Sequence, residues 1–200
     1  MLTLYHAPKS RSFGVLTLLH ELGAIDRVEI VPVSIQRGDG SGGPDPRNPH
    51  PERKVPYLVH DGEGIRERAA IFAWLTQQFP AAGLAPNPGE PGWGRYLSWL
   101  AWYQGVVEPV YLLDHLRISD PALTGTFRDT AAVAAALEAA LSAGPYLLGD
   151  RYSAADTLIA GLYGWRPEIT PDVPAIRDWA ARCNGRPSVA AAAAYDAGLG

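Results

Sequence analysis

The chain has 200 residues, of which 47% are hydrophobic, enough for a substantial core and too many for a disordered protein. Its net charge of −4, from 17 basic and 21 acidic residues, argues against a nucleic-acid partner, which usually needs a basic face. No apolar run approaches the roughly 20 residues of a membrane span, and the N-terminus lacks a signal-peptide pattern. The single cysteine, Cys183, excludes an internal disulfide and a Cys-x-x-Cys redox pair. We therefore expect a soluble cytoplasmic protein with no membrane partner.

The first 80 residues alternate between strand and helix patterns. Apolar residues at i, i+3, i+4 and i+7 predict an amphipathic helix that stops near Gly23. Residues 37–48 are rich in Gly, Pro and Asp and predict a mobile loop with at most one helical turn. Asp61-Gly62 is a hairpin signal. The expected order is strand 2–5, helix 15–22, strand 28–33, the loop, strands 56–59 and 64–66, and a helix from Glu67.

The second half of the chain is predicted to be helical. Prolines and glycines concentrate in residues 81–92, which we interpret as a linker between a domain of residues 1–80 and an all-helical domain of residues 93–200. Ser153-x-x-Asp156 has the spacing of a helix capping box, with Tyr152 placed as its hydrophobic staple. The expected helices cover 96–103 and its continuation 106–116, then 126–143, a helix opening at 153, 174–186 and 188–197.

The segment from Lys54 onwards carries the most informative chemistry. Val55-Pro56 precedes a short apolar strand and is a candidate cis peptide, because only an X-Pro bond adopts cis at low cost. Pro56 shapes the strand and can expose the Val55 backbone N–H and C=O for pairing with an extended ligand. Glu67-Arg68 then opens a helix, whose N-terminus is a natural anion site. Together these features predict a site for an extended, peptide-like ligand that carries a carboxylate.

The order of these elements and several local motifs resemble the cytosolic glutathione transferases over nearly the whole chain. The resemblance implies an α/β thioredoxin-like N-terminal domain (βαβ-ββα, with a mixed four-stranded sheet) followed by an all-α domain. It also implies a homodimer that uses glutathione as co-substrate. The motifs that carry it are Asn48-Pro49…Lys54-Val55-Pro56, Glu67-Arg68-Ala69-Ala70-Ile71 (similar to the family's Glu-Ser-x-Ala-Ile), Tyr146-Leu147-Leu148-Gly149-Asp150…Ser153-Ala154-Ala155-Asp156 and Arg186-Pro187-Ser188-Val189.

In this family the turn after the first strand carries the catalytic Ser, Cys or Tyr, and here three hydroxyls compete for the role. Ser10 follows a Pro-x pair and best matches the serine-type pattern of bacterial members. Ser12 is an alternative, although Ser is also a favoured helix N-cap. Tyr5 lies on the strand, where a core role is commoner. No Cys lies in this turn, so the family's cysteine-type chemistry is not expected.

The resemblance implies that glutathione contacts Lys54, Val55, Pro56, Glu67 and Arg68. Glu67 is the residue that would meet the ligand's amino group. Arg68 stands where the family has a Ser that holds the γ-glutamyl carboxylate. A guanidinium can bind a carboxylate bidentately, or its bulk can fill the pocket; we expect a retained anion site.

A second departure is Gly14, where some serine-type members carry an Arg. Arg11 or Lys9 is the candidate residue that would supply the local positive charge in place of that Arg. Gly14 and Arg68 are the two features that favour a relative of the family without activity.

The electrophile pocket is expected between the two halves, with an apolar lining that suits a small hydrophobic electrophile. No metal is expected, because Asp114 and His115 lack the spacing of a metal site. The predicted function is a detoxifying glutathione transferase that conjugates such an electrophile. The alternatives are a non-catalytic binding or assembly module with the same fold, or a glutathione-dependent isomerase or dehalogenase. The expected pocket lining is Phe13, Trp99, Trp102, Tyr103, Tyr111 and His115, with Trp165 as a further candidate.

Overall fold

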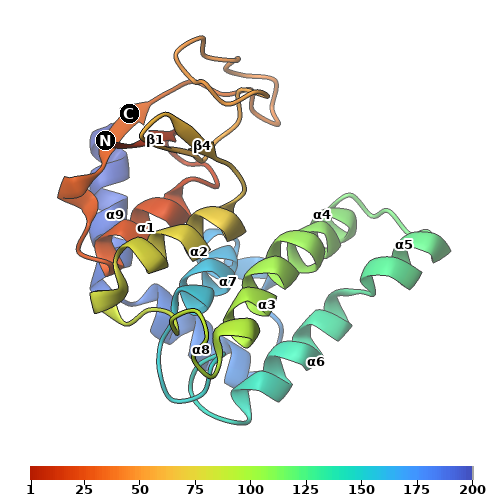
Figure 1. Ribbon diagram of the computed structural model, residues 1–200. Helices are drawn as coiled ribbons and strands as arrows, with labels where there is room; N and C mark the ends of the chain where they lie inside the picture. Colours follow the sequence, from red (N-terminus) through yellow and green to blue (C-terminus); the bar gives the residue numbers. More distant parts are fainter. Residues whose placement is uncertain (200) are drawn as a thin grey trace. The chain divides into compact units, whose positions relative to one another are not determined.

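The computed structural model describes residues 1–199 (Figure 1). The chain forms two compact units. The first, which we call the sheet unit, contains Met1–Ala82 together with Arg186–Gly200. The second, the helical unit, contains Gly83–Gly185. Within residues 1–199, no helix is both long enough and apolar enough to cross a membrane.

The sheet unit is built on four strands in the order β2-β1-β3-β4. Strand β1 pairs in parallel with β2 and antiparallel with β3, so that Leu4 lies opposite both Ile30 and Leu58. Strands β3 and β4 form an antiparallel hairpin around Asp61 and Gly62. The predicted mixed sheet is confirmed. The strands are β1 (Leu2–His6), β2 (Glu29–Pro32), β3 (Tyr57–His60) and β4 (Glu63–Ile65).

Three helices complete the sheet unit: α1 (Phe13–Glu21), α2 (Arg68–Gln78) and α9 (Pro187–Gly198). Helix α1 packs against both α2 and α9, and Figure 1 shows the blue α9 running alongside the red-orange α1. Single 3-10 turns lie at Ile25–Arg27 and Pro80–Ala82. The core comes from apolar side chains of β1, α1, β3 and α2 that are completely buried: Leu4, Leu16, Leu19, Leu58, Ile71, Phe72 and Leu75.

The connection between β2 and β3 is a loop without helix or strand, as its composition predicts. The loop is held in place at Asp45, which is 7% exposed. The Asp45 carboxylate accepts hydrogen bonds from the backbone N–H of Ser34 (3.1 Å) and of Arg47 (2.9 Å), and pairs with the Arg47 guanidinium. Hydrogen bonds from the side chain and backbone of Arg47 hold the pKa of this carboxyl well below its usual range.

The helical unit contains seven α- or π-helical segments within its described residues. Helix α7 packs against α8 and α3, and α6 packs against α8. Trp179 and Tyr96 are completely buried, which places large aromatic side chains at the centre of this unit. The segments are α3 (Trp93–Trp102), the π-helical η3 (Tyr103–Val107), α4 (Glu108–His115), α5 (Pro121–Phe127), α6 (Thr130–Leu141), α7 (Ala154–Trp165) and α8 (Pro174–Asn184), with a 3-10 turn at Pro167–Ile169.

The helix predicted over residues 126–143 is wrong in its bounds, because two helices occupy this region. Helix α5 ends where Arg128 adopts a positive φ of 67°, which breaks the helical path. Asp120 and Asp129 are the N-caps of α5 and α6, and each accepts a hydrogen bond of 2.8 Å from a backbone N–H of the first turn. The alanine-rich composition masked this break, which Asp120-Pro121 and Asp129 signal in the sequence.

The last helix belongs by its contacts to the sheet unit. The division by contacts thus differs from the predicted division by secondary structure, which grouped residues 93–200. The reason is packing: α9 lies against α1, and its buried residues Ala192 and Asp196 face that unit's interior. A boundary at the proline-rich segment near residue 82 is common to both divisions.

Candidate functional site

The chain before β3 is positioned by Asn48, which is completely buried. The Asn48 side-chain amide donates to the Lys54 carbonyl (3.0 Å), and its carbonyl oxygen accepts from the His50 N–H (3.0 Å). These bonds fix the approach to Val55, and the predicted cis Val55-Pro56 peptide is confirmed. Pro56 is buried, whereas Val55 is half-buried. The exposed Lys54 ammonium pairs with Glu52 rather than with another predicted site residue.

Val55 has the free backbone groups that strand addition requires. Within residues 1–199, neither the N–H nor the C=O of Val55 takes part in a hydrogen bond of the fold. A segment whose backbone groups are open can pair with an extended peptide. The geometry at Val55 is thus the one expected for a peptide-like ligand.

Helix α2 begins with an unusual backbone at its N-cap, Glu67. Glu67 has φ 70° and ψ 126°, in a region that residues other than glycine rarely adopt. Such strain costs of order 1–3 kcal/mol and clusters at ligand-binding positions. The Glu67 side chain is exposed, whereas Arg68 is only 8% exposed. The two neighbours therefore have different environments, and Arg68 is not a solvated surface arginine.

The turn between β1 and α1 brings Ser10 and Ser12 together. Their hydroxyl oxygens lie 2.8 Å apart. Ser10 donates to the Ala7 carbonyl (2.7 Å) and accepts from the Ser12 N–H (3.2 Å). Ser12 is completely buried, whereas Ser10 is half-buried. Of the two hydroxyls, that of Ser10 is the one open to a ligand.

Ser12 occupies the N-cap position of α1, but its hydroxyl does not cap the helix. The Ser12 Oγ lies 2.7 Å from His6 Nδ1 and accepts a hydrogen bond from the Ala7 N–H (3.2 Å). On the other side of the imidazole, His6 Nε2 lies 2.7 Å from an Asp196 carboxylate oxygen. The second Asp196 oxygen accepts from the Lys9 N–H (3.1 Å). The turn is thereby tied to α9.

Two family models match the chain. The model described as "Glutathione S-transferase, N-terminal domain" matches residues 4–88, and "Glutathione S-transferase, C-terminal domain" matches residues 119–187. The chain belongs to the glutathione S-transferase family. No curated protein matches it in sequence.

Solved structures of bacterial glutathione transferases are similar to this chain over nearly its whole length. A glutathione transferase from Methylococcus capsulatus is 27% identical with a TM-score of 0.78, covering 98% of this chain and 99% of the other. A sphingomonad glutathione S-transferase complexed with glutathione is 27% identical with a TM-score of 0.76, covering 98% of both chains. A beta class enzyme from Sphingomonas chungbukensis is 26% identical with a TM-score of 0.72, covering 99% and 100%. The thioredoxin-like fold followed by a helical region is thus the family fold.

The third hydroxyl candidate, Tyr5, lies apart from the two serines. It is half-buried on β1, and its ring lies 6.4 Å from that of Tyr57 on the adjacent strand. Tyr57 in turn packs edge-on against His50, at 5.0 Å between ring centroids. Tyr5 therefore belongs to an aromatic cluster on the sheet, and the catalytic role of each of the three hydroxyls stays a prediction.

The aromatic residues predicted to line an electrophile pocket occupy several environments in this family member. Trp99 and Trp102 are half-buried and pack edge to face, with ring centroids 5.2 Å apart. Tyr103 and Tyr111 are buried, and the Tyr111 hydroxyl lies 3.1 Å from that of Tyr163. These residues belong to the helical unit, whereas the half-buried Phe13 begins α1 of the sheet unit. Their role as a pocket lining stays a prediction.

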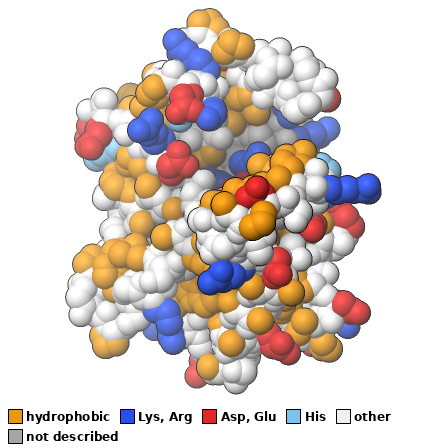
Figure 2. All heavy atoms as spheres, turned by 90° about the vertical axis from the view of Figure 1, so that its right-hand side faces the viewer, with side chains coloured by type: hydrophobic (Ala, Val, Ile, Leu, Met, Phe, Trp, Pro, Cys, Tyr) orange, Lys and Arg blue, Asp and Glu red, His pale blue; other side chains and the backbone are white. Residues whose placement is uncertain are grey.

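His115 and Trp165 are exposed, and His115 is close in sequence to exposed apolar residues of the helical unit. Leu112, Leu116 and Ile118, on and just after α4, are each about half exposed (49%, 54% and 48%). In the face shown in Figure 2, hydrophobic side chains reach the surface, and acidic and basic side chains are interspersed among them. This face carries no concentration of a single charge.

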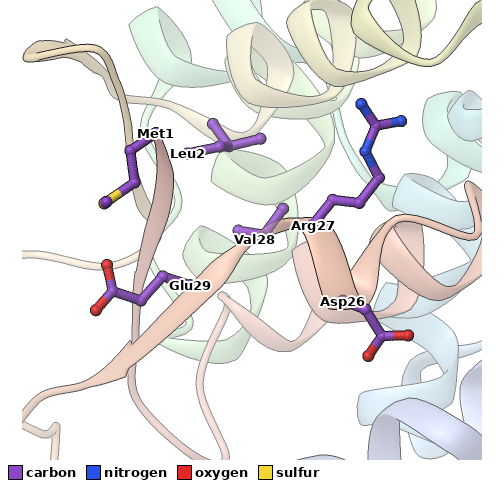
Figure 3. Close-up of a pocket in the computed structure, with 6 residues that line it drawn as sticks. All are labelled: Met1, Leu2, Asp26, Arg27, Val28 and Glu29. Carbon is purple, nitrogen blue, oxygen red and sulfur yellow. The ribbon is translucent and has the colours of Figure 1, made fainter.

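One surface pocket lies away from all predicted site residues. It is lined by the start of β1 and by residues before and within β2 (Figure 3). The side chains of Asp26 and Arg27 point away from each other, and the Arg27 guanidinium instead packs 4.7 Å from the centre of the Phe79 ring. The charged side chains of this pocket do not point towards a common centre, and we assign the pocket no function. The lining residues are Met1, Leu2, Asp26, Arg27, Val28 and Glu29.

Sequence reasoning missed two residues of the hydroxyl cluster, His6 and Asp196. A histidine next to a turn with three hydroxyl candidates was a usable signal for His6. Asp196 lies 190 positions away and carries no motif that points to the turn. Only the packing of α9 against α1 brings it there.

Proposed function

We propose that the chain is a glutathione transferase that joins the thiol of glutathione to a small hydrophobic electrophile, with the Ser10 hydroxyl as hydrogen-bond donor to the thiolate. The observation that carries the proposal is the position of Ser10: a half-buried hydroxyl in the turn that enters α1, beside a second serine that is buried. The family relation supports glutathione as the co-substrate, and a sphingomonad relative is complexed with it.

The chemistry requires the thiol to lose its proton near neutral pH. A free thiol has a pKa of about 8.5, and each unit of depression needs about 1.4 kcal/mol of preferential stabilisation of the thiolate. A hydroxyl donor and the N-terminus of α1 supply favourable interactions with a negative sulfur. Ser10 would then keep the thiolate oriented while the electrophile binds beside it.

The rest of the ligand would follow β3 and α2. The open backbone N–H and C=O of Val55 suit the cysteinyl backbone of the tripeptide. In this proposal Glu67, at the exposed start of α2, contacts the ligand's amino group, and Arg68 with the α2 N-terminus binds its carboxylate. Lys54 and Pro56 complete the proposed contact segment. The protein we propose is a cytoplasmic, detoxifying homodimer that needs no metal.

The test combines glutathione binding by calorimetry with conjugation of a chlorodinitrobenzene. We expect binding and conjugation by the unaltered protein. We expect Ser10→Ala to lower kcat/KM about 10- to 100-fold, since a hydrogen bond to a charged group contributes about 1.5–3 kcal/mol. Glutathione affinity should change little in this variant. Absence of binding at millimolar glutathione would contradict the proposal.

Arg68 provides the second arm of the same test. We expect Arg68→Ala to weaken glutathione binding, and Arg68→Lys to restore it only in part, because an ammonium cannot reproduce a bidentate guanidinium contact. The exposed Arg66, two residues earlier, is the matched control, and Arg66→Ala should leave affinity unchanged. Unchanged affinity in Arg68→Ala would exclude the residue from the ligand site.

A second function is favoured by the two departures from the family pattern, Gly14 and Arg68. A protein that keeps the fold but neither binds nor conjugates glutathione would be a binding or assembly module. Binding without conjugation, but with turnover of an isomerisable or halogenated substrate, would indicate a glutathione-dependent isomerase or dehalogenase. The calorimetric and kinetic measurements above separate these outcomes.

A further inference from the structure

The Ser10 hydroxyl is the outer end of a continuous hydrogen-bonded chain within the sheet unit. Successive distances are 2.8 Å from Ser10 Oγ to Ser12 Oγ, 2.7 Å from Ser12 Oγ to His6 Nδ1, and 2.7 Å from His6 Nε2 to the Asp196 carboxylate. Ser12 and His6 are completely buried, and Asp196 is 7% exposed. The half-buried Ser10 is thus the end of the chain that a ligand can reach.

The direction of the protons in this chain follows from the groups themselves. The Asp196 carboxylate can only accept, so His6 Nε2 carries a hydrogen and donates it. A neutral imidazole then has Nδ1 as its acceptor, and the Ser12 hydroxyl donates to it. Ser12 Oγ accepts from the Ala7 N–H and is also within reach of the Ser10 hydroxyl. In this structure the Ser10 hydroxyl donates to the Ala7 carbonyl (2.7 Å), so it must turn to Ser12 Oγ, 2.8 Å away, before every link points from Ser10 towards His6.

The electrostatic setting lowers the pKa of His6, so the imidazole is neutral at rest and Nδ1 is open as an acceptor. Burial is the main influence on the His6 pKa and lowers it, while the charge of Asp196 and its hydrogen bond act in the opposite direction. Asp196 is the charged group that acts on the imidazole, and it arrives from α9, whereas Ser12 approaches from the α1 side. Lys9 contributes its backbone N–H, which holds the second oxygen of Asp196 at 3.1 Å.

We propose that His6, paired with Asp196, accepts the proton of the bound glutathione thiol through Ser10 and Ser12. The S–H bond breaks and its electron pair stays on sulfur. The proton passes to Ser10 Oγ, the Ser10 proton passes to Ser12 Oγ, and the Ser12 proton passes to His6 Nδ1. The product is a thiolate that accepts a hydrogen bond from Ser10, and an imidazolium paired with the Asp196 carboxylate. This inference rests on the proposed glutathione activity.

The relay makes a prediction about proton release that does not depend on turnover. If the thiol proton moves to His6, thiolate forms on binding while few protons enter the solvent. Calorimetry of glutathione binding at neutral pH in buffers of different ionisation enthalpy measures the released protons, and ultraviolet absorbance measures the thiolate. We expect thiolate formation with much less than one proton released. Thiolate with a full proton released would overturn the relay and leave the transferase intact. No glutathione binding would overturn both.

Two variants test whether His6 is the group that accepts the thiol proton. Asp196→Asn keeps the shape and an oxygen acceptor but removes the charge that supports an imidazolium. We expect the pKa of the bound thiol to rise by about one unit, a tenfold loss of thiolate below that pKa, with glutathione affinity little changed. Ser12→Ala interrupts the chain at a buried position and should give the same shift. Thiol pKa values equal to that of the unaltered protein in both variants would contradict the relay.

A control distinguishes the relay from a loosening of α9. The Glu21 carboxylate binds the Arg186 guanidinium and the Ser188 hydroxyl, a second tie between α1 and α9 that does not touch the hydroxyl chain. Glu21→Gln weakens the packing of α9 while it keeps Asp196 and His6. We expect the thiol pKa of this variant to equal that of the unaltered protein. An equal shift in Glu21→Gln and Asp196→Asn would reduce Asp196 to a purely structural role.

Discussion

Asp156 is completely buried at the start of α7, where its carboxylate joins three parts of the helical unit. It accepts hydrogen bonds from the N–H (2.9 Å) and hydroxyl (2.7 Å) of Ser153, which completes the predicted capping box. It also accepts from the Leu147 N–H (2.9 Å) and from the indole N–H of Trp179 (2.9 Å). Burial raises the pKa of Asp156, and these hydrogen bonds oppose that rise.

We expect Asp156→Ala to lower the free energy of unfolding by about 3–5 kcal/mol, because each buried donor left without an acceptor costs about 1–3 kcal/mol. Urea unfolding followed by tryptophan fluorescence measures the change. The control is Asp178→Ala on α8, whose side chain is exposed and whose loss should cost less than about 0.5 kcal/mol. A loss in Asp156→Ala as small as that of the control would show that the carboxylate does not organise this unit.

At the scale of elements, α9 is held against α1 by the side chain of Glu21, which is only 6% exposed. Its carboxylate accepts from Arg186 through two nitrogens and from the Ser188 hydroxyl. Burial by itself would raise the pKa of Glu21, but the hydrogen bonds and charge of Arg186 and the Ser188 hydroxyl outweigh it and lower the pKa. The ionised form is therefore favoured by folding.

Because the folded state lowers the pKa of Glu21, its contribution to stability is present above the unfolded pKa of about 4.3 and is lost as pH falls through the folded value. We expect Glu21→Gln to reduce the free energy of unfolding by about 1–3 kcal/mol at neutral pH. The difference from the unaltered protein should shrink as pH falls below about 4. Urea unfolding across this pH range provides the measurement, and a difference that stays constant with pH would contradict the ion pair.

At the scale of the whole molecule, the chain returns to its beginning. Residues 186–200 join residues 1–82 in one unit, although 103 residues of the helical unit, Gly83–Gly185, lie between them in the sequence. Helix α9 covers α1 and delivers Asp196 to the turn that holds Ser10. The first 82 residues are thus an incomplete unit, both for packing and for the proposed chemistry.

We expect a fragment of residues 1–82 to be poorly folded alone and to gain structure when a peptide of residues 186–200 is added. The reason is that α9 shields apolar surface of α1 and supplies a partner for the buried His6. Near-ultraviolet circular dichroism and amide chemical-shift dispersion report the change. A peptide of the same composition in scrambled order serves as control. A fragment that is fully folded without the peptide would show that α9 is dispensable.

Much of the fold was predictable because its signals are local. Helical periodicity located α1, the hairpin signal located β3 and β4, and the Ser153–Asp156 spacing identified the start of α7. The break between α5 and α6 was missed because alanine favours helix on both sides of it, so that composition hid the two Asp caps. The backbone at Val55 and Glu67 is consistent with the predicted ligand contacts, and these contacts remain predictions.

The sequence by itself determined the order of strands and helices up to α2, the cis Val55-Pro56 peptide and the family, since each depends on residues close together in the chain or on motifs in a given order. Only the tertiary structure decided which hydroxyl is buried and what it contacts. Ser10 and Ser12 are equivalent as residue types, and their difference arises from burial and from a carboxylate 184 positions beyond Ser12, Asp196. Packing of α9 against α1 makes that contact, and no local pattern encodes it.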